Sequence, residues 1–464
     1  MSVRRPIRRR LMGSHTMRLE RPAPARRPGS GSLTIIGGLA AILALGTVLL
    51  MMPFSTADGE WAHPMEALFT AVSAMCVTGL VVVETGEHWS TWGHIWILLL
   101  IQVGGLGYML GTSLILWILG RRLGLRDQYM LRLYYGAPSM SEAIAFARKI
   151  AAYALAFQIL GAIALAIAFM AEGRPGGESA WWAIFHSISA FNNAGFNVTG
   201  QDLVLFQDDA AVLLIVSVLV VAGGVGAVPV LAFMARKSIR RLPLDAKLIF
   251  LTTGILLAIG TVFLLGVEWR NAQTIGGVEG AQRPVLAFFQ ATVPRTAGFS
   301  AVDVVDLTDE SKFFQMALML IGGAAGSTAG GIKVGTFALL AFAMLAALRG
   351  TSDVTALGRR VPFMIIFQAL TIVLLAIALA FIVSILLLWS SDMRDIDVLF
   401  DSISAVGTVG LSTGVPADAN TFGQFVIIVA MLLGRFGPLL LVLEMNQPRR
   451  RSRYQAPEDS IRLG

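Results

Sequence analysis

The sequence predicts an all-α polytopic membrane protein with eight spans, arranged as four repeats around a pseudo-fourfold axis. Each repeat is expected to contain a span, a re-entrant pore helix with a filter loop, and a second span (M1–P–M2). Hydrophobic residues make up 56% of the chain and charged residues only 14%, whereas soluble domains average about 25% charged residues. In addition, long apolar segments alternate with short ones, and each short segment ends in a similar glycine motif.

The long apolar segments are long enough to cross a bilayer, which takes about 20 apolar residues. The predicted spans are Leu33–Phe54, Ile95–Leu119, Ala151–Ala171, Ala211–Met234, Leu248–Val267, Phe313–Leu348, Val361–Trp389 and Phe422–Val442. The short segments are better suited to re-entrant helices. These are Met65–Val77, Trp181–Phe191, Val285–Val293 and Val398–Val406.

Charge predicts the orientation. With the N-terminus inside, the inner segments hold 28 Lys and Arg against 8 Asp and Glu, and the outer segments hold 5 against 21. This asymmetry follows the positive-inside rule and places both termini in the cytoplasm. The acidic outer residues are either solvated loop residues or a means of concentrating cations at a pore mouth, and both explanations can hold. The predicted divisions are basic tails at 1–30 and 447–464 and pore repeats at 31–120, 144–236, 243–350 and 360–446.

Enzyme and cofactor motifs are not found in the sequence. Cys76 is the single cysteine, and the five histidines lack the spacing of metal ligands. The chain contains no phosphate-binding loop and no dinucleotide-binding fingerprint. We therefore expect no catalytic residues, no cofactor on this chain and no nucleic-acid partner.

A repeated motif carries the expected function. Its copies read FTAVSAMCVTGL, FHSISAFNNAGF, FQATVPRTAGF and FDSISAVGTVGL, beginning at Phe69, Phe185, Phe289 and Phe400. A potassium filter replaces the water around the ion with backbone carbonyls from four loops, and glycine allows the backbone conformation and the close approach that this requires. Close helix packing by small residues is the alternative explanation for a single copy, but it fits four regularly placed copies poorly. The predicted K⁺-binding filter residues are Val77, Thr78, Gly79, Asn193, Ala194, Gly195, Thr296, Ala297, Gly298, Thr408, Val409 and Gly410.

A second motif predicts a gate beneath the filter. The segment IGGAAGSTAGGIKVG (Ile321–Gly335) is too rich in glycine to hold a good helix, and we expect it to break the sixth predicted span and to lie across the pore. A rigid glycine kink is the alternative. Arg435 lies within the last span, where it either narrows the pore or extends to the inner surface. The predicted gate residues are Gly322, Gly323, Ala324, Ala325, Gly326, Ser327, Thr328, Ala329, Gly330, Gly331, Lys333 and Arg435.

These motifs, together with the terminal GRFGPL stretch, resemble the Trk/Ktr/HKT superfamily of potassium transporters from about Leu33 to Glu444. Because one span precedes the first filter, the chain is most similar to the KtrB-type (TrkH-like) membrane subunit. Cys76, Val77 and the arginine-rich N-terminal tail depart from the usual pattern.

The resemblance implies a homodimer in the lipid of a bacterial plasma membrane, gated by a cytosolic ring of nucleotide-binding RCK subunits (KtrA/TrkA-like). It also implies K⁺ as the transported ion and Na⁺ as a candidate activator. A glycine at position 79 favours potassium over sodium by the same resemblance. The expected function is thus a channel-like K⁺ uptake subunit. A secondary cation symporter is the main alternative, although no Asp or Glu falls in the predicted spans, and a non-conducting scaffold is a second.

Overall fold

The computed structural model describes residues 30–110, 140–351 and 353–445. The predicted tails at 1–30 and 447–464, and the end of the span predicted at Ile95–Leu119, lie almost wholly outside these ranges. The helices are α1 (Ser30–Met51), α2 (Pro64–Cys76), α3 (Thr85–His88), α4 (Thr91–Leu110), α7 (Met140–Ala171), α8 (Gly176–Asn192), α9 (Ala210–Val225), α10 (Ala227–Arg236), α11 (Leu244–Val267), α12 (Arg283–Thr292), α13 (Asp309–Leu320), α14 (Val334–Leu348), α15 (Phe363–Leu387), α16 (Asp395–Gly407), α17 (Val415–Asp418) and α18 (Thr421–Met445). Strands β1 (Thr355–Ala356) and β2 (Arg359–Arg360) pair antiparallel.

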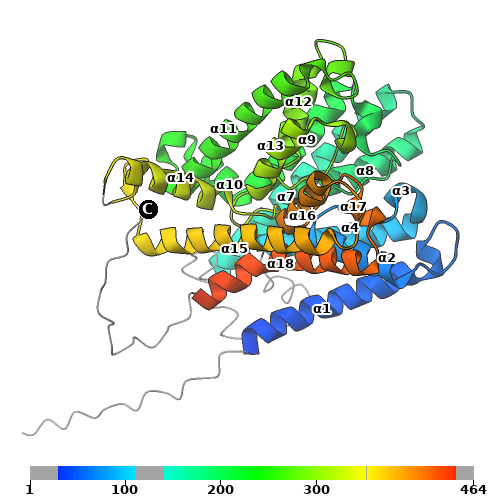
Figure 1. Ribbon diagram of the computed structural model, residues 1–464, viewed down its shortest axis with the longest axis horizontal. Helices are drawn as coiled ribbons and strands as arrows, with labels where there is room; N and C mark the ends of the chain where they lie inside the picture. Colours follow the sequence, from blue (N-terminus) through cyan, green and yellow to red (C-terminus); the bar gives the residue numbers. More distant parts are fainter. Residues whose placement is uncertain (1–29, 111–139, 352, 446–464) are drawn as a thin grey trace, which may run out of the picture.

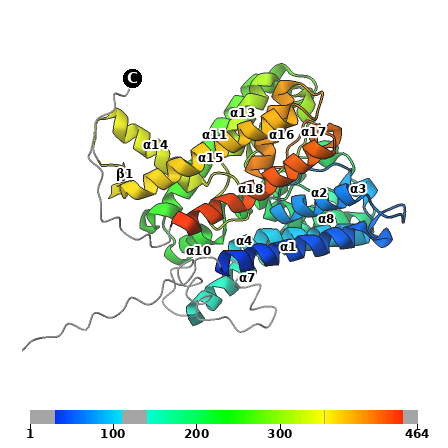
Figure 2. The same ribbon diagram turned by 60° about the horizontal axis from the view of Figure 1, so that its bottom comes forward.

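Each of the helices α2, α8, α12 and α16 follows a longer helix, namely α1, α7, α11 and α15. The helices α15 and α18 run side by side in both views, and α16 packs against each of them (Figures 1 and 2). The phenylalanine that begins each repeated motif is fully buried on one of these short helices, at positions 69, 185, 289 and 400. The hydrophobic core therefore surrounds the short helices, which explains why the motif begins with a large apolar side chain.

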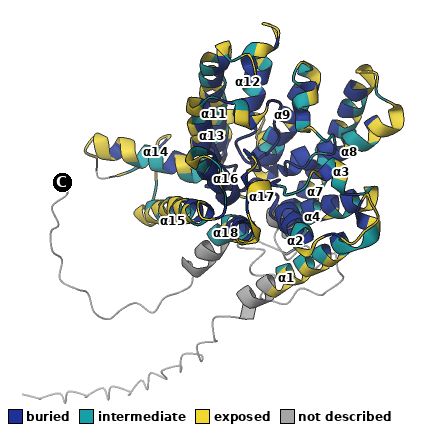
Figure 3. Cartoon of the chain, turned by 45° about the vertical axis from the view of Figure 1, so that its right-hand side comes forward, coloured by how far each residue is buried: buried dark blue, intermediate teal, exposed yellow. Residues whose placement is uncertain are grey.

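Apolar helices long enough to cross a membrane are present. Within the described residues, four helices are long and apolar enough to span a bilayer: Ile144–Ala171, Leu244–Arg270, Phe363–Leu387 and Thr421–Pro438. The bent pair α9 and α10 would make a fifth, and several apolar helices are shorter. Figure 3 shows exposed residues along α14 and α15 at the periphery, and the exposed side chains of α15 include Phe363, Met364 and Phe381. Such an apolar exterior suits contact with lipid.

One predicted span is two helices rather than one. The sequence suggests a continuous helix over Ala211–Met234, but α9 and α10 meet at an angle of 90°. Gly226 between them has φ +78°, which glycine tolerates and other residues rarely adopt. A Cβ atom at Gly226 would approach Ser327 to 3.1 Å. The bend thus makes room for the glycine-rich segment of the third repeat, which hydropathy alone cannot reveal.

Candidate functional site: a ring of four glycine loops and the loop beneath it

The four short helices end in the same way. Three of them have a C-terminal residue in the left-handed conformation, at Val77, Asn193 and Thr408. In the third copy Thr296 adopts φ +72°, after a less regular turn. A left-handed residue ends a helix and turns the chain sharply. Each predicted filter strand therefore leaves its helix at the helix C-terminus, the partly negative end of the helix dipole.

The four glycines form a closed ring. A Cβ atom placed on any of them would come within 3.0 Å of the carbonyl oxygen that precedes the next glycine, closer than real Cβ atoms come. These contacts run from Gly79 to Ala194, from Gly195 to Ala297, from Gly298 to Val409 and from Gly410 back to Thr78. All four glycines have positive φ, between 71° and 102°. Segments that are far apart in sequence therefore meet around one axis, and any side chain on the glycines would break the ring.

The remaining predicted filter residues line the same strands. Their exposed fractions are 1% or less at Val77, Thr78, Asn193, Ala194, Thr296, Ala297, Thr408 and Val409. The hydroxyls of Thr78, Thr296 and Thr408 have no partner among the described residues. Buried polar atoms normally find partners, so these threonines place three unpaired hydroxyls on strands that carry ring glycines.

Serines on the short helices support the strands, and sequence reasoning missed them. The N–H of Gly79 donates to Oγ of Ser73 at 3.1 Å, and the N–H of Gly410 donates to Oγ of Ser404 at 3.1 Å. In the second copy Ser189 Oγ donates to the carbonyl of Phe196 at 2.8 Å. The signal was available, since a serine lies four residues after the phenylalanine in three of the four copies.

The glycine-rich segment is a compact loop between α13 and α14. Its neck is closed by a hydrogen bond from the N–H of Gly322 to the carbonyl of Ile332, at 2.9 Å, and by a parallel bridge between Ile321 and Ile332. The Lys333 ammonium donates to the carbonyl of Ala329 at 2.7 Å. The sixth predicted span is therefore interrupted between Leu320 and Val334.

The loop reaches two of the predicted filter strands. The hydroxyl of Thr328 lies 3.0 Å from Oδ1 of Asn193 and 3.2 Å from the carbonyl of Phe191, both at the end of α8. On another side, Gly330 lies directly against the hydroxyl of Thr408. The N–H of Ala324 also donates to the carbonyl of Gly224 on α9, at 2.8 Å. The loop thus bridges the second and fourth copies, at the helix side of the ring.

Glycines on α4, α9 and α18 allow close packing. Gly104, Gly223 and Gly434 each lie against a carbonyl near the end of their own short helix. The guanidinium of Arg435 is 2% exposed and donates to the carbonyl of Gly104 at 3.3 Å. Arg435 therefore points into the protein, toward the first copy, and does not extend to the surface.

Amide side chains join the first two copies inside the apolar region. Gln102 of α4 and Gln158 of α7 exchange two hydrogen bonds of 2.9 Å, and Nδ2 of Asn192 donates to Oε1 of Gln102. Sequence reasoning missed this network because single amides within apolar runs carry no pattern. These bonds offset part of the cost of burying the amides, while Oδ1 of Asn192 has no partner among the described residues.

The loops beyond the ring are held by acidic side chains. Oδ2 of Asp202 accepts the N–H of Ser300 at 2.6 Å, so the second copy is joined to the third. Burial raises the pKa of Asp202 to about 8, against the effect of this hydrogen bond. Lys312 of α13 forms a fully buried ion pair of 2.8 Å with Asp397 of α16. These contacts fix the third copy between its neighbours.

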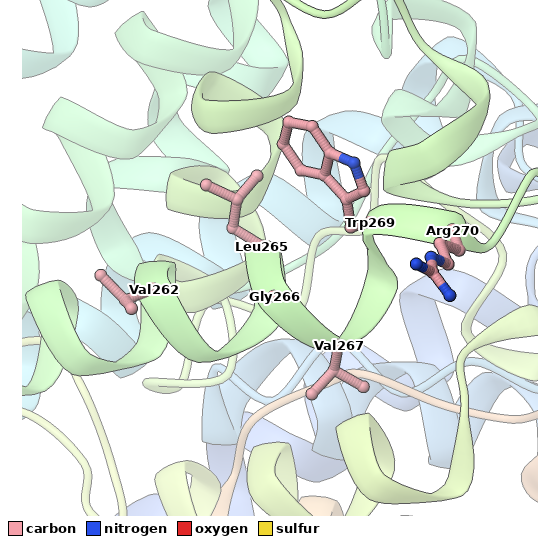
Figure 4. Close-up of a pocket in the computed structure, with 6 residues that line it drawn as sticks. All are labelled: Val262, Leu265, Gly266, Val267, Trp269 and Arg270. Carbon is pink, nitrogen blue, oxygen red and sulfur yellow. The ribbon is translucent and has the colours of Figure 1, made fainter.

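A surface hollow does not belong to the site. It lies at the C-terminal end of α11 and is lined by Val262, Leu265, Gly266, Val267, Trp269 and Arg270 (Figure 4). None of the predicted filter or gate residues is among them.

The apolar helices of the fold define a membrane protein, and comparison with known proteins assigns it to cation transport. The profile of the TrkH family, described as "Cation transport protein", matches residues 42–452. The chain belongs to this family and is therefore a transporter rather than an enzyme. It is 33% identical over 436 residues to the potassium/sodium uptake protein NtpJ of Enterococcus hirae, covering 93% of this chain and 96% of that one.

Other relatives are similar over the same length. The chain is 32% identical over 429 residues to the Ktr system potassium uptake protein B of Bacillus subtilis, covering 92% of this chain and 95% of that one. It is 34% identical over 433 residues to the protein of the same name from Vibrio alginolyticus, with 93% and 94% covered. Among solved structures, the potassium transporter TrkH of Vibrio parahaemolyticus shares the fold, with a TM-score of 0.66, 20% identity and 92% of this chain and 87% of that one covered.

Proposed function

We propose that this chain is the potassium-conducting membrane subunit of a Ktr/Trk-type uptake system. The observation that carries the proposal is the closed ring of Gly79, Gly195, Gly298 and Gly410. Backbone carbonyls aligned along such a ring replace the water of a dehydrated cation. Four helix C-termini directed at the ring add a favourable field for positive charge. No side-chain chemistry is needed for conduction.

Potassium is the ion proposed because the relatives are named for it. Three of them are named as potassium uptake proteins, and the name of one of these also includes sodium. Carbonyl oxygens suit a weakly hydrated monovalent ion, and each unit charge moving inward gains about 2.3 kcal/mol per 100 mV of membrane potential. We propose Na⁺ only as an activator, in keeping with the family resemblance.

The four M1–P–M2 repeats, in chain order, are the proposed pore. Their helices are α1, α2 and α4; α7, α8 and α9; α11, α12 and α13; and α15, α16 and α18. In this arrangement the interrupted or bent helices complete the eight proposed spans. Positive charge in the inner segments supports cytoplasmic termini in a bacterial plasma membrane.

The loop from Gly322 to Lys333 is the proposed gate. Its contacts with Asn193 and Thr408 support a position across the ion path, directly below the filter. Arg435 would narrow the same passage from the first copy, because it donates to Gly104. Control of the loop by a cytosolic RCK ring, and assembly as a homodimer, are proposed from the family resemblance and from the Ktr system to which the relatives are assigned.

The alternative is a secondary symporter with alternating access. Such a transporter would require one half of the protein to rotate against the other half around a fixed binding site. The ring of four glycine loops favours a pore instead, because its contacts join every copy to the next. A non-conducting scaffold would tolerate a side chain at the ring, which gives a direct test.

The test is growth of a potassium-uptake-deficient bacterium at limiting potassium, with the wild-type chain, Gly79→Ser and the control Gly254→Ala. Gly254 lies in α11 with open space around its Cα. We expect rescue by the wild type and by Gly254→Ala, and weaker or less selective rescue by Gly79→Ser. Absence of rescue by wild-type protein shown to be in the membrane, with an RCK partner present, would overturn the proposal. A saturable uptake with fixed ion stoichiometry would favour the symporter.

A further inference from the structure

The third filter strand is held differently from the other three. Four residues after its phenylalanine, each of the other copies has a serine, whose hydroxyl bonds the strand. The third copy has Val293 at this position, whose side chain offers no hydrogen bond, although its backbone carbonyl accepts the N–H groups of Ala297 at 3.0 Å and Gly298 at 3.5 Å. The strand that bears Gly298 therefore lacks the side-chain anchor that its neighbours share.

Arg295 lies where the missing anchor would be needed. It stands three residues before Gly298 and is 7% exposed. Its Nη2 lies 3.4 Å from the hydroxyl of Thr253 on α11 and 3.4 Å from the carbonyl of Gly322. Gly322 is the first residue of the loop neck, whose N–H is bonded to Ile332. Arg295 thus belongs to the third filter strand by its backbone, and its side chain contacts the neck of the proposed gate.

The charge of this guanidinium is compensated by dipoles. Arg295 forms no ion pair with any residue in the described part of the chain, and its Nε has no partner there. It lines a narrow internal gap between α9, α11 and the loop, together with Gly224, Thr253 and Gly323. A buried charge that relies on a few carbonyl and hydroxyl groups is sensitive to the loss of any one of them.

We propose that Arg295 couples the gate to the filter. While the loop is in place, the carbonyl of Gly322 holds the guanidinium and so fixes the third filter strand. When the loop moves, the contact is lost, and the strand that has no serine anchor is released. The ion selectivity of the pore then depends on the state of the gate through this one strand. The inference rests on the proposed function and assigns to Arg295 a positioning role.

The other strands provide the comparison. The serine contacts of Ser73 and Ser404 are made within one copy and do not touch the loop. Their removal should loosen the filter equally whether the loop is present or absent. Unlike these serines, Arg295 contacts the loop, so its removal, and not theirs, should make the third filter strand independent of the gate.

The experiment measures K⁺ and Na⁺ flux into liposomes that contain the purified protein. The variants are Arg295→Met, a deletion of residues 325–330 within the loop, the two combined, and Arg270→Met as a control on an exposed arginine of the same copy. Because hydrogen bonds to charged groups are among the stronger ones, we expect Arg295→Met to raise resting flux and to lower the K⁺/Na⁺ flux ratio, each by about tenfold. The deletion should lower the ratio in the wild type but cause no further change in the Arg295→Met background.

An unchanged ratio in Arg295→Met, or equal effects of the deletion in both backgrounds, would overturn the coupling while leaving the pore intact. Absence of flux in the wild type would instead overturn the proposed function. If Arg295→Met does not purify as a folded protein, Thr253→Val replaces it, since it removes the other contact of the guanidinium. The expected change then has the same direction and a smaller size, and no change would count against the coupling.

Discussion

The hydroxyl of Thr328 lies 3.0 Å from Oδ1 of Asn193, although the two residues are 135 positions apart in the chain. Thr328 belongs to the loop between α13 and α14, and Asn193 is the left-handed residue that ends α8. The proposed gate is thus fastened to the start of the second filter strand by a buried contact.

Removal of this contact should open the gate more often. Thr328→Val keeps the shape of the side chain and removes the hydroxyl. A net hydrogen bond contributes about 1 kcal/mol, so we expect resting K⁺ flux to rise about fivefold. The control is Thr371→Val, whose hydroxyl bonds only to its own helix at Phe367. Liposome flux measures both variants, and equal flux from Thr328→Val and the wild type would argue against a latch.

A methyl group at the ring should stop conduction. Gly410→Ala would place a Cβ against the carbonyl of Thr78 at a backbone φ of +102°. We expect loss of most K⁺ uptake, because strain and a steric clash both distort the ring. Gly266→Ala, in open space at the end of α11, is the matched control. Normal uptake by Gly410→Ala at equal membrane abundance would exclude the ring as the ion path.

The serine anchors should affect selectivity more than stability. Ser404→Ala frees the N–H of Gly410, which then loses the hydrogen bond to the serine hydroxyl that holds it at the ring. We expect the K⁺/Na⁺ flux ratio to fall by about fivefold, the equivalent of one net hydrogen bond. Ser384→Ala is the control, because its hydroxyl bonds within α15 to Ala380. A ratio equal to that of the wild type would show that the strand is fixed by its backbone alone.

The buried ion pair of Lys312 and Asp397 should matter for folding. Lys312→Met leaves a buried carboxylate with only Arg394, which is 57% exposed, as a partner. Breaking one side of a buried pair costs about 3–5 kcal/mol. We expect a lower thermal unfolding midpoint in detergent, and partial recovery in Lys312→Met combined with Asp397→Asn. An additive loss in the double variant would mean that the two groups do not stabilise one another.

Asp202 should make stability depend on pH. Its folded pKa of about 8 lies above the ordinary value of 3.8, so the folded state binds this proton more tightly than the unfolded chain does. Stability from this group therefore falls as pH rises from about 4 to about 8 and is constant above that range. We expect the thermal unfolding midpoint of Asp202→Asn to depend less on pH than that of the wild type between pH 6 and pH 8.5. Parallel pH profiles for the variant and the wild type would contradict the assignment.

The sequence by itself determined the class of this protein. Its composition predicts a bilayer environment, because so much apolar surface cannot be hidden from water otherwise, and the spacing of the four glycine motifs predicts the proposed filter strands. The interruption after Leu320 was also predictable, since six glycines in fifteen residues oppose a helix. These are local properties of chain segments, and they depend only on which residues follow one another in the sequence.

The tertiary structure alone decided how those segments meet. Nothing in the sequence pairs Thr328 with Asn193, or Arg295 with Gly322, because contacts between distant segments depend on how helices pack. The bend at Gly226 also depends on packing between distant segments. In the sequence, α9 and α10 form one apolar segment, but in the structure the loop of another copy lies in the angle between them. Hydropathy records how much surface a segment must hide from water, whereas the partner that hides it is chosen by shape and hydrogen bonding across the whole fold.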